Sequence, residues 1–210
     1  MPVDQPLYPV NLVVAGRRCL VVGGGRIAAR KAEGLVRCGA EVHVVGTEVG
    51  EEVRALAVTW DERPYRAGEA ADYRLVITAT GDPDVDGAVY ADGEAAGVWV
   101  NSADDPARCS FTLPAVARQG PIVLTASTGG HSPALATWLR RRLESDIGPE
   151  YLTLLGLLEE ERRELHAAGR STEELDWQAA LDSGMLELVR EGRLAEARER
   201  LQACLSSSSD

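Results

Sequence analysis

Residues 17–33 constrain the fold of this chain more than any other segment. They begin with the apolar run Cys-Leu-Val-Val at 19–22, continue with three glycines at 23–25, and end in a helical pattern that opens on small residues. A buried strand, a glycine turn and a helix in this order are typical of a dinucleotide-binding βα unit. The letters Gly-Gly-Gly-Arg-Ile-Ala at 23–28 match its G-x-G-x-x-[GA] fingerprint. A dinucleotide site is therefore the first hypothesis.

Each position of the fingerprint has a physical role under that hypothesis. Gly23 permits the tight turn, Gly25 lets a pyrophosphate approach the backbone, and Ala28 lets the helix pack closely on the strand. The phosphates would lie against free N–H groups at the helix start. A glycine-rich turn without a ligand is the alternative, but the strand before and the helix after favour binding. The predicted cofactor-binding residues of this turn are Gly23, Gly24, Gly25, Arg26, Ile27 and Ala28.

Strand-like and helix-like segments alternate over the first 130 residues. This alternation predicts an α/β fold with a Rossmann-like, mostly parallel sheet and helices on both faces. From residue 151 onward the periodicity is helical, which predicts a small all-α region of about three helices. The expected strands cover residues 17–22, 41–45, 58–60, 73–80, 98–101 and 122–127, and the expected helices cover residues 26–38, 50–57, 85–96 and 133–146.

The composition excludes several classes of protein. A formal net charge of −11 argues against binding to nucleic acid or to an anionic membrane, because both need a basic surface. No apolar run approaches the ~20 residues of a membrane span, and no secretory signal is evident. The four cysteines are scattered without a C-x-x-C pair, so neither a disulfide framework nor a metal site is expected. A cytoplasmic protein fits this pattern best.

Positive charge gathers in one part of this acidic chain. Between residues 101 and 143 there are five arginines against two acids, a net of +3. An anionic ligand would be drawn to such a region. The arginines are Arg108, Arg118, Arg140, Arg141 and Arg142.

The end of the second expected strand bears on the choice of cofactor. In NAD sites an acid about 20 residues past the glycines binds the adenosine ribose, and here that position falls near Gly46. Thr47 and Glu48 follow, with Glu51 and Glu52 beyond them, so a ribose 2′-phosphate would meet like charge. The pattern favours NAD over NADP, although a solvated acidic loop explains any single one of these carboxylates equally well.

Two further loops follow the carboxyl ends of expected strands, where ligands bind in open α/β sheets. Residues 101–111 carry Asp104, Asp105 and Arg108, a set suited to acid–base chemistry or to a polar substrate, with a capped turn as the alternative. Residues 127–133 form a second glycine-rich turn before a helix. This turn is suited to gripping an anion, or to an ordinary strand-to-helix connection.

Four motifs together point to a family. They are Gly-Gly-Gly-Arg-Ile-Ala-Ala-Arg-Lys at 23–31, Ala-Thr-Gly-Asp at 79–82, Val-Asn-Ser-Ala-Asp-Asp-Pro at 100–106 with Cys-Ser-Phe at 109–111, and Ser-Thr-Gly-Gly-His-Ser-Pro at 127–133. Over residues 11–143 the chain resembles the precorrin-2 dehydrogenase family, the dehydrogenase portion of siroheme synthase, whose pattern reads like VGGGxVAxRK, ATxD, VNxxDxPxxCxF and SSGGxSP. The resemblance implies oxidation of precorrin-2, a polycarboxylate tetrapyrrole, to sirohydrochlorin with NAD.

The resemblance also implies site residues. The family aspartate falls on Asp104, which would be the catalytic acid–base or substrate-orienting group, whereas Asp105 stands at a variable position. Together with Thr47, the second motif adds Thr80 and Asp82 to the cofactor-binding residues. The implied substrate-binding residues are Asn101, Arg108, Ser127, Thr128, Gly129, Gly130, His131 and Arg140.

An organisation in four parts follows from the same likeness. Residues 1–112 would bind NAD, residues 113–150 would exchange contacts with a second subunit in a homodimer, and residues 151–205 would form a helical domain over the active site. Residues 206–210 are expected to be a disordered tail. No methyltransferase region follows, which indicates a stand-alone form.

Alternative functions stay open. Some members of the family also insert iron into sirohydrochlorin, for which Asp104 and His131 are candidates without a ligand motif. A rival from another class is a regulatory NAD-binding module of the transporter-gating type, which has no need of residues 101–111 or 127–133. An unrelated small-substrate dehydrogenase would carry a catalytic His or Lys, but the single lysine, Lys31, lies in the glycine-turn helix.

Overall fold

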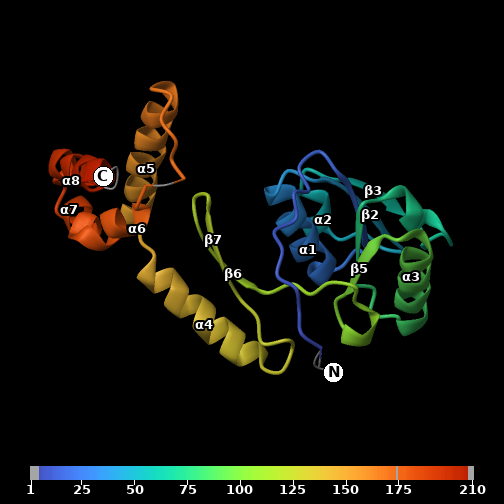
Figure 1. Ribbon diagram of the computed structural model, residues 1–210. Helices are drawn as coiled ribbons and strands as arrows, with labels where there is room; N and C mark the ends of the chain where they lie inside the picture. Colours follow the sequence, from blue (N-terminus) through green and yellow to red (C-terminus); the bar gives the residue numbers. More distant parts are fainter. Residues whose placement is uncertain (1–4, 174, 208–210) are drawn as a thin grey trace. The chain divides into compact units, whose positions relative to one another are not determined.

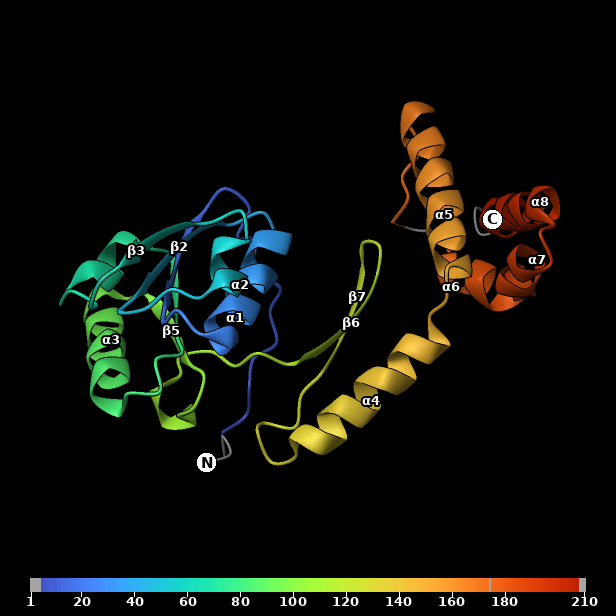
Figure 2. The same ribbon diagram turned by 180° about the vertical axis from the view of Figure 1, so that it is seen from behind.

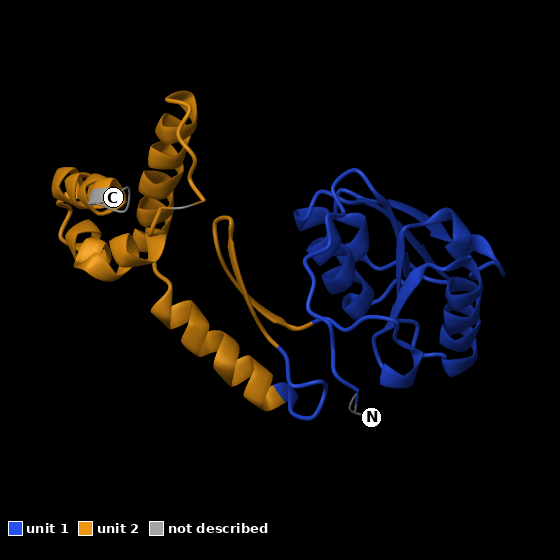
Figure 3. Cartoon of the chain, in the orientation of Figure 1, with its two compact units in different colours: residues 1–113, 127–133 blue, residues 114–126, 134–210 orange. Residues whose placement is uncertain are grey.

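Two compact units make up the chain (Figure 3). The computed structural model describes residues 5–173 and 175–207. The first unit comprises residues 1–113 with 127–133, and the second comprises residues 114–126 with 134–210. The turn at 127–133 therefore groups with the first unit, although the segments on either side of it belong to the second.

A parallel sheet forms the centre of the first unit (Figure 1). Its strands are β1 (Arg18–Val22), β2 (Glu41–Gly46), β3 (Thr59–Glu62), β4 (Leu75–Thr78) and β5 (Trp99–Ser102). Their order is β3-β2-β1-β4-β5, so β1 lies in the middle of the sheet. The apolar run at 19–22 is buried throughout, as its composition predicts. The expected Rossmann-like α/β fold is confirmed.

Helices cover both faces of this sheet (Figures 1 and 2). They are α1 (Arg26–Arg37), α2 (Glu51–Arg54), the 3₁₀ turn η1 (Glu69–Asp72) and α3 (Pro83–Ala96). On one face, Ala28 and Ala32 of α1 and Val53 of α2 join the core. On the other face, Ala70 of η1 and Val89 of α3 do the same. Small residues on α1 let that helix lie close to the strands, as the fingerprint predicts.

The carboxyl ends of β1, β4 and β5 meet at one edge of the sheet. Val22 on β1 is aligned with Thr78 on β4, which is aligned with Ser102 on β5. The glycine turn, the 79–82 turn and the 101–111 loop leave the sheet from these three ends. They therefore lie side by side at the edge where open α/β sheets bind ligands.

The strand expected at residues 122–127 does not extend the parallel sheet. It is β7 (Ile122–Ala126), which pairs antiparallel with β6 (Ala115–Gln119) in a two-stranded hairpin of the second unit. The sequence predicts the strand at 122–127 but not its partner β6. The physical reason is the short connection, in which Gly120 has a φ of +54°, because a turn this tight permits only antiparallel pairing.

The second unit is otherwise helical. Its elements are α4 (Pro133–Asp146), α5 (Glu150–Ala167), α6 (Trp177–Ala180), the π-helical turn η3 (Leu181–Met185), α7 (Leu186–Arg190) and α8 (Leu194–Ser207). Helices α5 to α8 share a core that includes Leu154, Met185 and Leu201. The all-α region is confirmed, with more interruptions than expected because Gly184 and Gly192 both have positive φ.

Of the expected tail at 206–210, the structure describes residues 206 and 207. α8 continues through Ser207, so the first two of these residues are helical, and residues 208–210 lie outside the described residues. Across the described part of the chain, no helix combines the length and the apolar character needed to cross a membrane.

Candidate functional site

Two residues of the glycine turn have no room for a side chain. A Cβ on Gly23 would lie 2.3 Å from the carbonyl oxygen of Ala79, and a Cβ on Gly24 would lie 1.8 Å from that of Glu48. Gly23 also has a φ of +121°, which other residues rarely adopt. The Gly50 N–H donates to the Gly24 carbonyl at 2.9 Å. Gly23 and Gly24 are therefore required by the packing of the protein's own backbone.

Gly25 differs from the two glycines before it. It is the N-cap of α1 with a φ of −85°, and a Cβ there would meet no atom within 4 Å. Among the described residues, packing does not require a glycine at this position. The absence of a side chain instead keeps the space over the helix start open. The first N–H groups of a helix have no intrahelical acceptor and carry the positive end of the helix dipole. The turn thus fits a pyrophosphate.

The other residues expected in the cofactor site divide between surface and core. Arg26 and Ile27 are exposed on the first turn of α1, and Thr47 and Glu48 are exposed beyond β2. Ala28 is fully buried between α1 and the sheet. Ala28 therefore has the packing role predicted for it, and the exposed residues flank the open space next to Gly25.

The structure explains why the usual acid is missing after β2. A Cβ on Gly46 would lie 2.8 Å from the Gly24 nitrogen, so no side chain fits at the position expected for the acid. The nearby Arg54 on α2 donates to Glu62 Oε2 at 2.5 Å and to the Val49 carbonyl at 2.9 Å. This guanidinium is already paired with a carboxylate, which supports the expected preference for NAD over NADP.

The polar groups of the 79–82 turn are engaged within the turn and with α3. The Thr80 hydroxyl donates to Asp86 Oδ1 at 2.6 Å and accepts from the Asp82 N–H at 3.0 Å. The Asp82 carboxylate caps α3 by accepting from the Asp84 N–H at 2.9 Å. Both side chains hold the turn, whose Ala79 carbonyl abuts Gly23. Direct contact of Thr80 and Asp82 with a cofactor stays a prediction.

Two side chains of the 101–111 loop are engaged within the first unit. The buried Asn101 amide donates to the Phe111 carbonyl at 2.9 Å and so closes the loop. The Arg108 guanidinium lies 3.4 Å from Asp105 Oδ2 and donates to the Pro83 carbonyl at the start of α3. These contacts stabilise the loop, and a role of Asn101 and Arg108 in substrate binding remains a prediction.

The structure separates the two acids of this loop. Asp105 is the N-cap of the 3₁₀ turn η2 (Pro106–Arg108), where its carboxylate accepts from the Ala107 N–H at 3.0 Å. Asp104 is exposed and has no hydrogen-bond partner among residues 5–173 and 175–207. A carboxylate with free oxygens at the ligand-binding edge is available for proton transfer, whereas a capping carboxylate is not.

Lys31, which was not among the predicted site residues, is a further candidate beside Asp104. It lies half-buried on α1. Burial lowers the pKa of its ammonium group, and the neighbouring Arg30 lowers it further, whereas Cys109 and Asp104 raise it. A cation therefore lies within electrostatic range of Asp104. The signal for it was the helical spacing, which places Lys31 four residues after Ile27 on the same side of α1.

The turn at 127–133 is closed by its own backbone and hydroxyl groups. The His131 N–H donates to the Thr128 carbonyl at 3.0 Å, and the Ser132 N–H donates to the Thr128 hydroxyl at 3.1 Å. The Gly129 N–H donates to the Ser127 hydroxyl at 3.3 Å. Gly129 and Gly130 both have positive φ, which explains the pair of glycines. A ligand role for this turn stays a prediction.

The predicted arginine cluster is divided between the two units. Arg108 lies in the first unit, and Arg118 and residues 140–142 belong to the second. On α4, Arg140 forms an ion pair with Glu144, and the Arg142 guanidinium lies 5.2 Å from the centre of the Trp138 ring. Within the first unit, the structure thus brings together the glycine turn, the 79–82 turn and the 101–111 loop.

A comparison with family models decides the class of the first unit. The NAD(P)-binding family NAD_binding_7 matches residues 10–115, which include the whole parallel sheet and the 101–111 loop. The chain belongs to this NAD(P)-binding family. Membership confirms an NAD-type cofactor, and the open space at Gly25 would fit its pyrophosphate.

Several proteins are similar in sequence to this NAD(P)-binding protein over most of its length. Siroheme synthases of Nitrosomonas europaea and Pseudomonas putida are each 36% identical to it, covering 96% and 95% of the chain but only 44% of their own length. The structure of SirC, precorrin-2 dehydrogenase, matches with a TM-score of 0.73 and 26% identity over 94% of this chain and 98% of SirC. The chain thus spans less than half the length of these siroheme synthases. The predicted family resemblance is confirmed.

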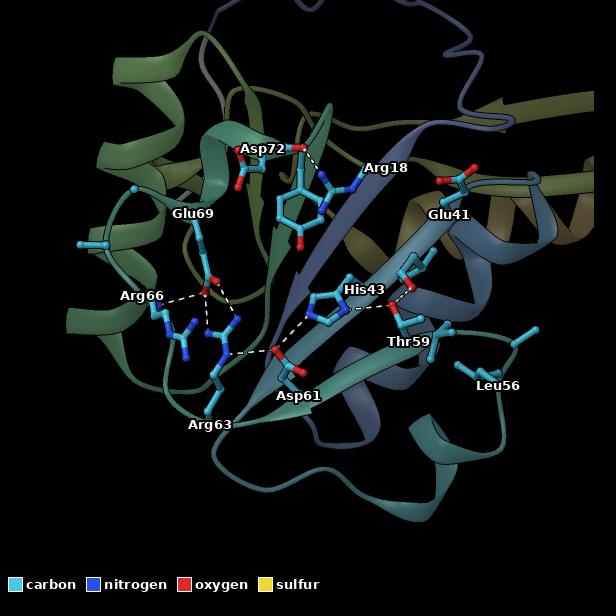
Figure 4. A pocket seen from close by; sticks show the side chains of 16 residues that line it. Arg18, Glu41, His43, Leu56, Thr59, Asp61, Arg63, Arg66, Glu69 and Asp72 are labelled. Atoms are coloured by element: carbon cyan, nitrogen blue, oxygen red, sulfur yellow. Dashed lines mark hydrogen bonds and ion pairs between the residues drawn. The ribbon is translucent and has the colours of Figure 1, made fainter.

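A separate pocket lies over β2 and β3 of the NAD(P)-binding unit (Figure 4). It has a volume of ≈ 1090 Å³, and its lining includes no residue of the glycine turn. His43 accepts or donates a hydrogen bond of 2.8 Å with the Thr59 hydroxyl, and Arg63 pairs with Glu69 at 2.8 Å and with Asp61 at 3.1 Å. These polar groups pair with one another, and the pocket lies apart from the glycine turn.

Proposed function

We propose that the chain is an NAD-dependent precorrin-2 dehydrogenase that oxidises precorrin-2 to sirohydrochlorin in the cytoplasm. The observation that carries the proposal is the match to SirC, precorrin-2 dehydrogenase, over nearly the full length of both chains. The site supports it independently, because an open dinucleotide turn at Gly25 and the free carboxylate of Asp104 lie at the same edge of the sheet. A regulatory NAD-binding module has no need of Asp104.

Each part of the site has a task in this reaction. The oxidation removes a hydride and a proton from the substrate, and NAD, when bound, supplies the hydride acceptor. The glycine turn and the N-terminus of α1 would hold its pyrophosphate. Asp104 would take up the proton, since it is exposed and its oxygens are not engaged in a cap. Lys31 would bind a substrate carboxylate beside it, which suits a polycarboxylate ligand.

Anaerobic turnover tests the proposal directly. Purified protein, NAD and fresh precorrin-2 should give NADH and the sirohydrochlorin absorbance together, and NADP should support the reaction poorly. Absence of both signals with an active batch of substrate would refute the proposed reaction. Adding ferrous ion to the same assay reports whether metal also enters the ring, an activity that the proposal does not require.

The proposal also includes an assembly. Residues 1–112 would bind the cofactor, residues 113–150 would pair with a second copy of the chain, and residues 151–205 would form the helical domain over the site. Exposed apolar side chains on α4, Leu135 and Trp138, support a role of that segment in self-association. Analytical ultracentrifugation of the intact protein tests the homodimer.

Replacing Lys31 with methionine should weaken substrate binding. Methionine keeps the apolar stem but removes the ammonium, and the loss of one charge-assisted contact predicts a KM for precorrin-2 raised about tenfold. The dissociation constant of NAD should change less than about twofold because Gly25 and the helix start are untouched. Lys31→Arg is the matched control and should retain most of the affinity. Equal KM values for Lys31→Met and wild type would exclude Lys31 from substrate binding.

A further inference from the structure

A small group of buried polar side chains lies beneath the cofactor edge, between the sheet and α3. Asp86, in the first turn of α3, is only 4% exposed, and Thr78 at the end of β4 is fully buried. The hydroxyls of Thr78 and Thr80 both donate to the same oxygen, Asp86 Oδ1, the second at 2.6 Å. Ser102, aligned with Thr78 on β5, has a buried hydroxyl without a partner among the described residues.

These polar groups stabilise the fold less than apolar side chains would in the same place. Burying the Asp86 carboxylate and the hydroxyls of Thr78 and Ser102 costs free energy unless they are hydrogen-bonded, whereas apolar side chains of similar size carry no such penalty. The Ser102 hydroxyl is left unpaired even so. Valines at these positions would stabilise the core more. Stability alone therefore does not explain the polar groups.

One of the two hydroxyls bound to Asp86 connects it to the glycine turn. Thr80 belongs to the 79–82 turn, and its hydroxyl also accepts from the Asp82 N–H at 3.0 Å, which fixes the shape of that turn. The residue before it is Ala79, whose carbonyl oxygen packs directly against Gly23. A Cβ on Gly23 would lie only 2.3 Å from this oxygen. The path from Asp86 to the cofactor turn therefore passes through Thr80 and the adjoining peptide.

We propose that Asp86 is a positioning residue of the dinucleotide site. Its carboxylate holds Thr80 and thereby the 79–82 turn in the conformation that faces the glycine turn and receives NAD. Thr78 anchors the same carboxylate from β4 but does not belong to the turn. The inference concerns cofactor binding alone and does not depend on the tetrapyrrole substrate.

The two threonines provide a matched test. Thr80→Val and Thr78→Val each remove one hydroxyl that donates to the same carboxylate oxygen, but only Thr80 lies in the turn. Thr80→Val should weaken NAD binding about tenfold, the effect of losing one hydrogen bond to a charged group. Thr78→Val should change NAD affinity less than about twofold while lowering the melting temperature comparably. Isothermal titration of the intact protein measures the affinities.

Variants of Asp86 itself complete the experiment. Asp86→Asn keeps an oxygen that accepts from both hydroxyls and should bind NAD within about threefold of wild type, whereas Asp86→Ala should lose about tenfold or more. Equal losses for Thr80→Val and Thr78→Val, or wild-type affinity in Asp86→Ala, would overturn the inference. If Asp86→Ala does not fold, the threonine pair decides. A wild-type protein that binds NAD but does not oxidise precorrin-2 would refute the proposed reaction and leave this inference standing.

Discussion

Gly25→Asp is expected to abolish NAD binding without unfolding the protein. The new side chain would enter the open space over the start of α1, where a Cβ meets no atom within 4 Å. Its charge would face the pyrophosphate, and two like charges about 4 Å apart near a protein surface repel by roughly 4 kcal/mol. We therefore expect NAD affinity to fall by at least about 100-fold, measured by isothermal titration.

The same helix provides a control for this substitution. Gly34 also lies in α1, and a Cβ there would meet no atom within 4 Å. Gly34→Asp adds the same charge more than two turns away and should leave NAD affinity almost unchanged, because surface charges at that distance are screened. Unchanged affinity in Gly25→Asp, with circular dichroism like that of wild type, would mean that the pyrophosphate does not lie at this turn.

Asp104→Ala is expected to remove most of the dehydrogenase activity and to leave NAD binding intact. A positioned general acid or base contributes about 100-fold or more to a rate, so kcat should fall by at least that factor. Asp104 is exposed and has no hydrogen-bond partner in the described part of the chain, so the melting temperature should hardly move. Steady-state kinetics with precorrin-2 and a thermal melt measure the two effects.

Asp105→Ala is the matched control for Asp104. It removes the cap of η2 and the ion pair with Arg108, which should cost about 1 kcal/mol of stability. Activity should remain within a few-fold of wild type. If Asp105→Ala is inactive and Asp104→Ala is active, the proposed mechanism assigns proton transfer to the wrong aspartate.

The sequence was sufficient for the parallel sheet and the cofactor turn. The β-branched run of β1 and the glycine fingerprint are local signals, and local signals survive without knowledge of tertiary contacts. The pairing of β7 was missed because it depends on a partner strand, Ala115–Gln119, whose pattern is too short to predict alone. The family pattern selected Thr80 and Asp82, yet only the structure shows their side chains engaged in capping and turn formation.

Other features of the site depend on packing that no sequence pattern displays. Asp104 and Asp105 are adjacent and chemically identical, and their difference arises from which one meets the N–H groups of η2. The burial of Asp86 and Thr78 comes from α3 packing on β4 and β5, and the part-buried Thr80 donates to the same carboxylate from the turn. Such roles are set by three-dimensional neighbours and not by residue type.

The contacts around the glycine turn have a consequence for how this site tolerates change. Gly23, Gly24 and Gly46 each face backbone atoms of another segment, the carbonyls of Ala79 and Glu48 and the nitrogen of Gly24. Any amino acid supplies the same backbone atoms, so the exposed position 48 is free to vary in ways that the glycines are not, whereas Ala79 is also held by its packing against the core. The shape of the glycine turn thus depends on three absent side chains, and we expect substitutions of the exposed Glu48 to leave that shape intact.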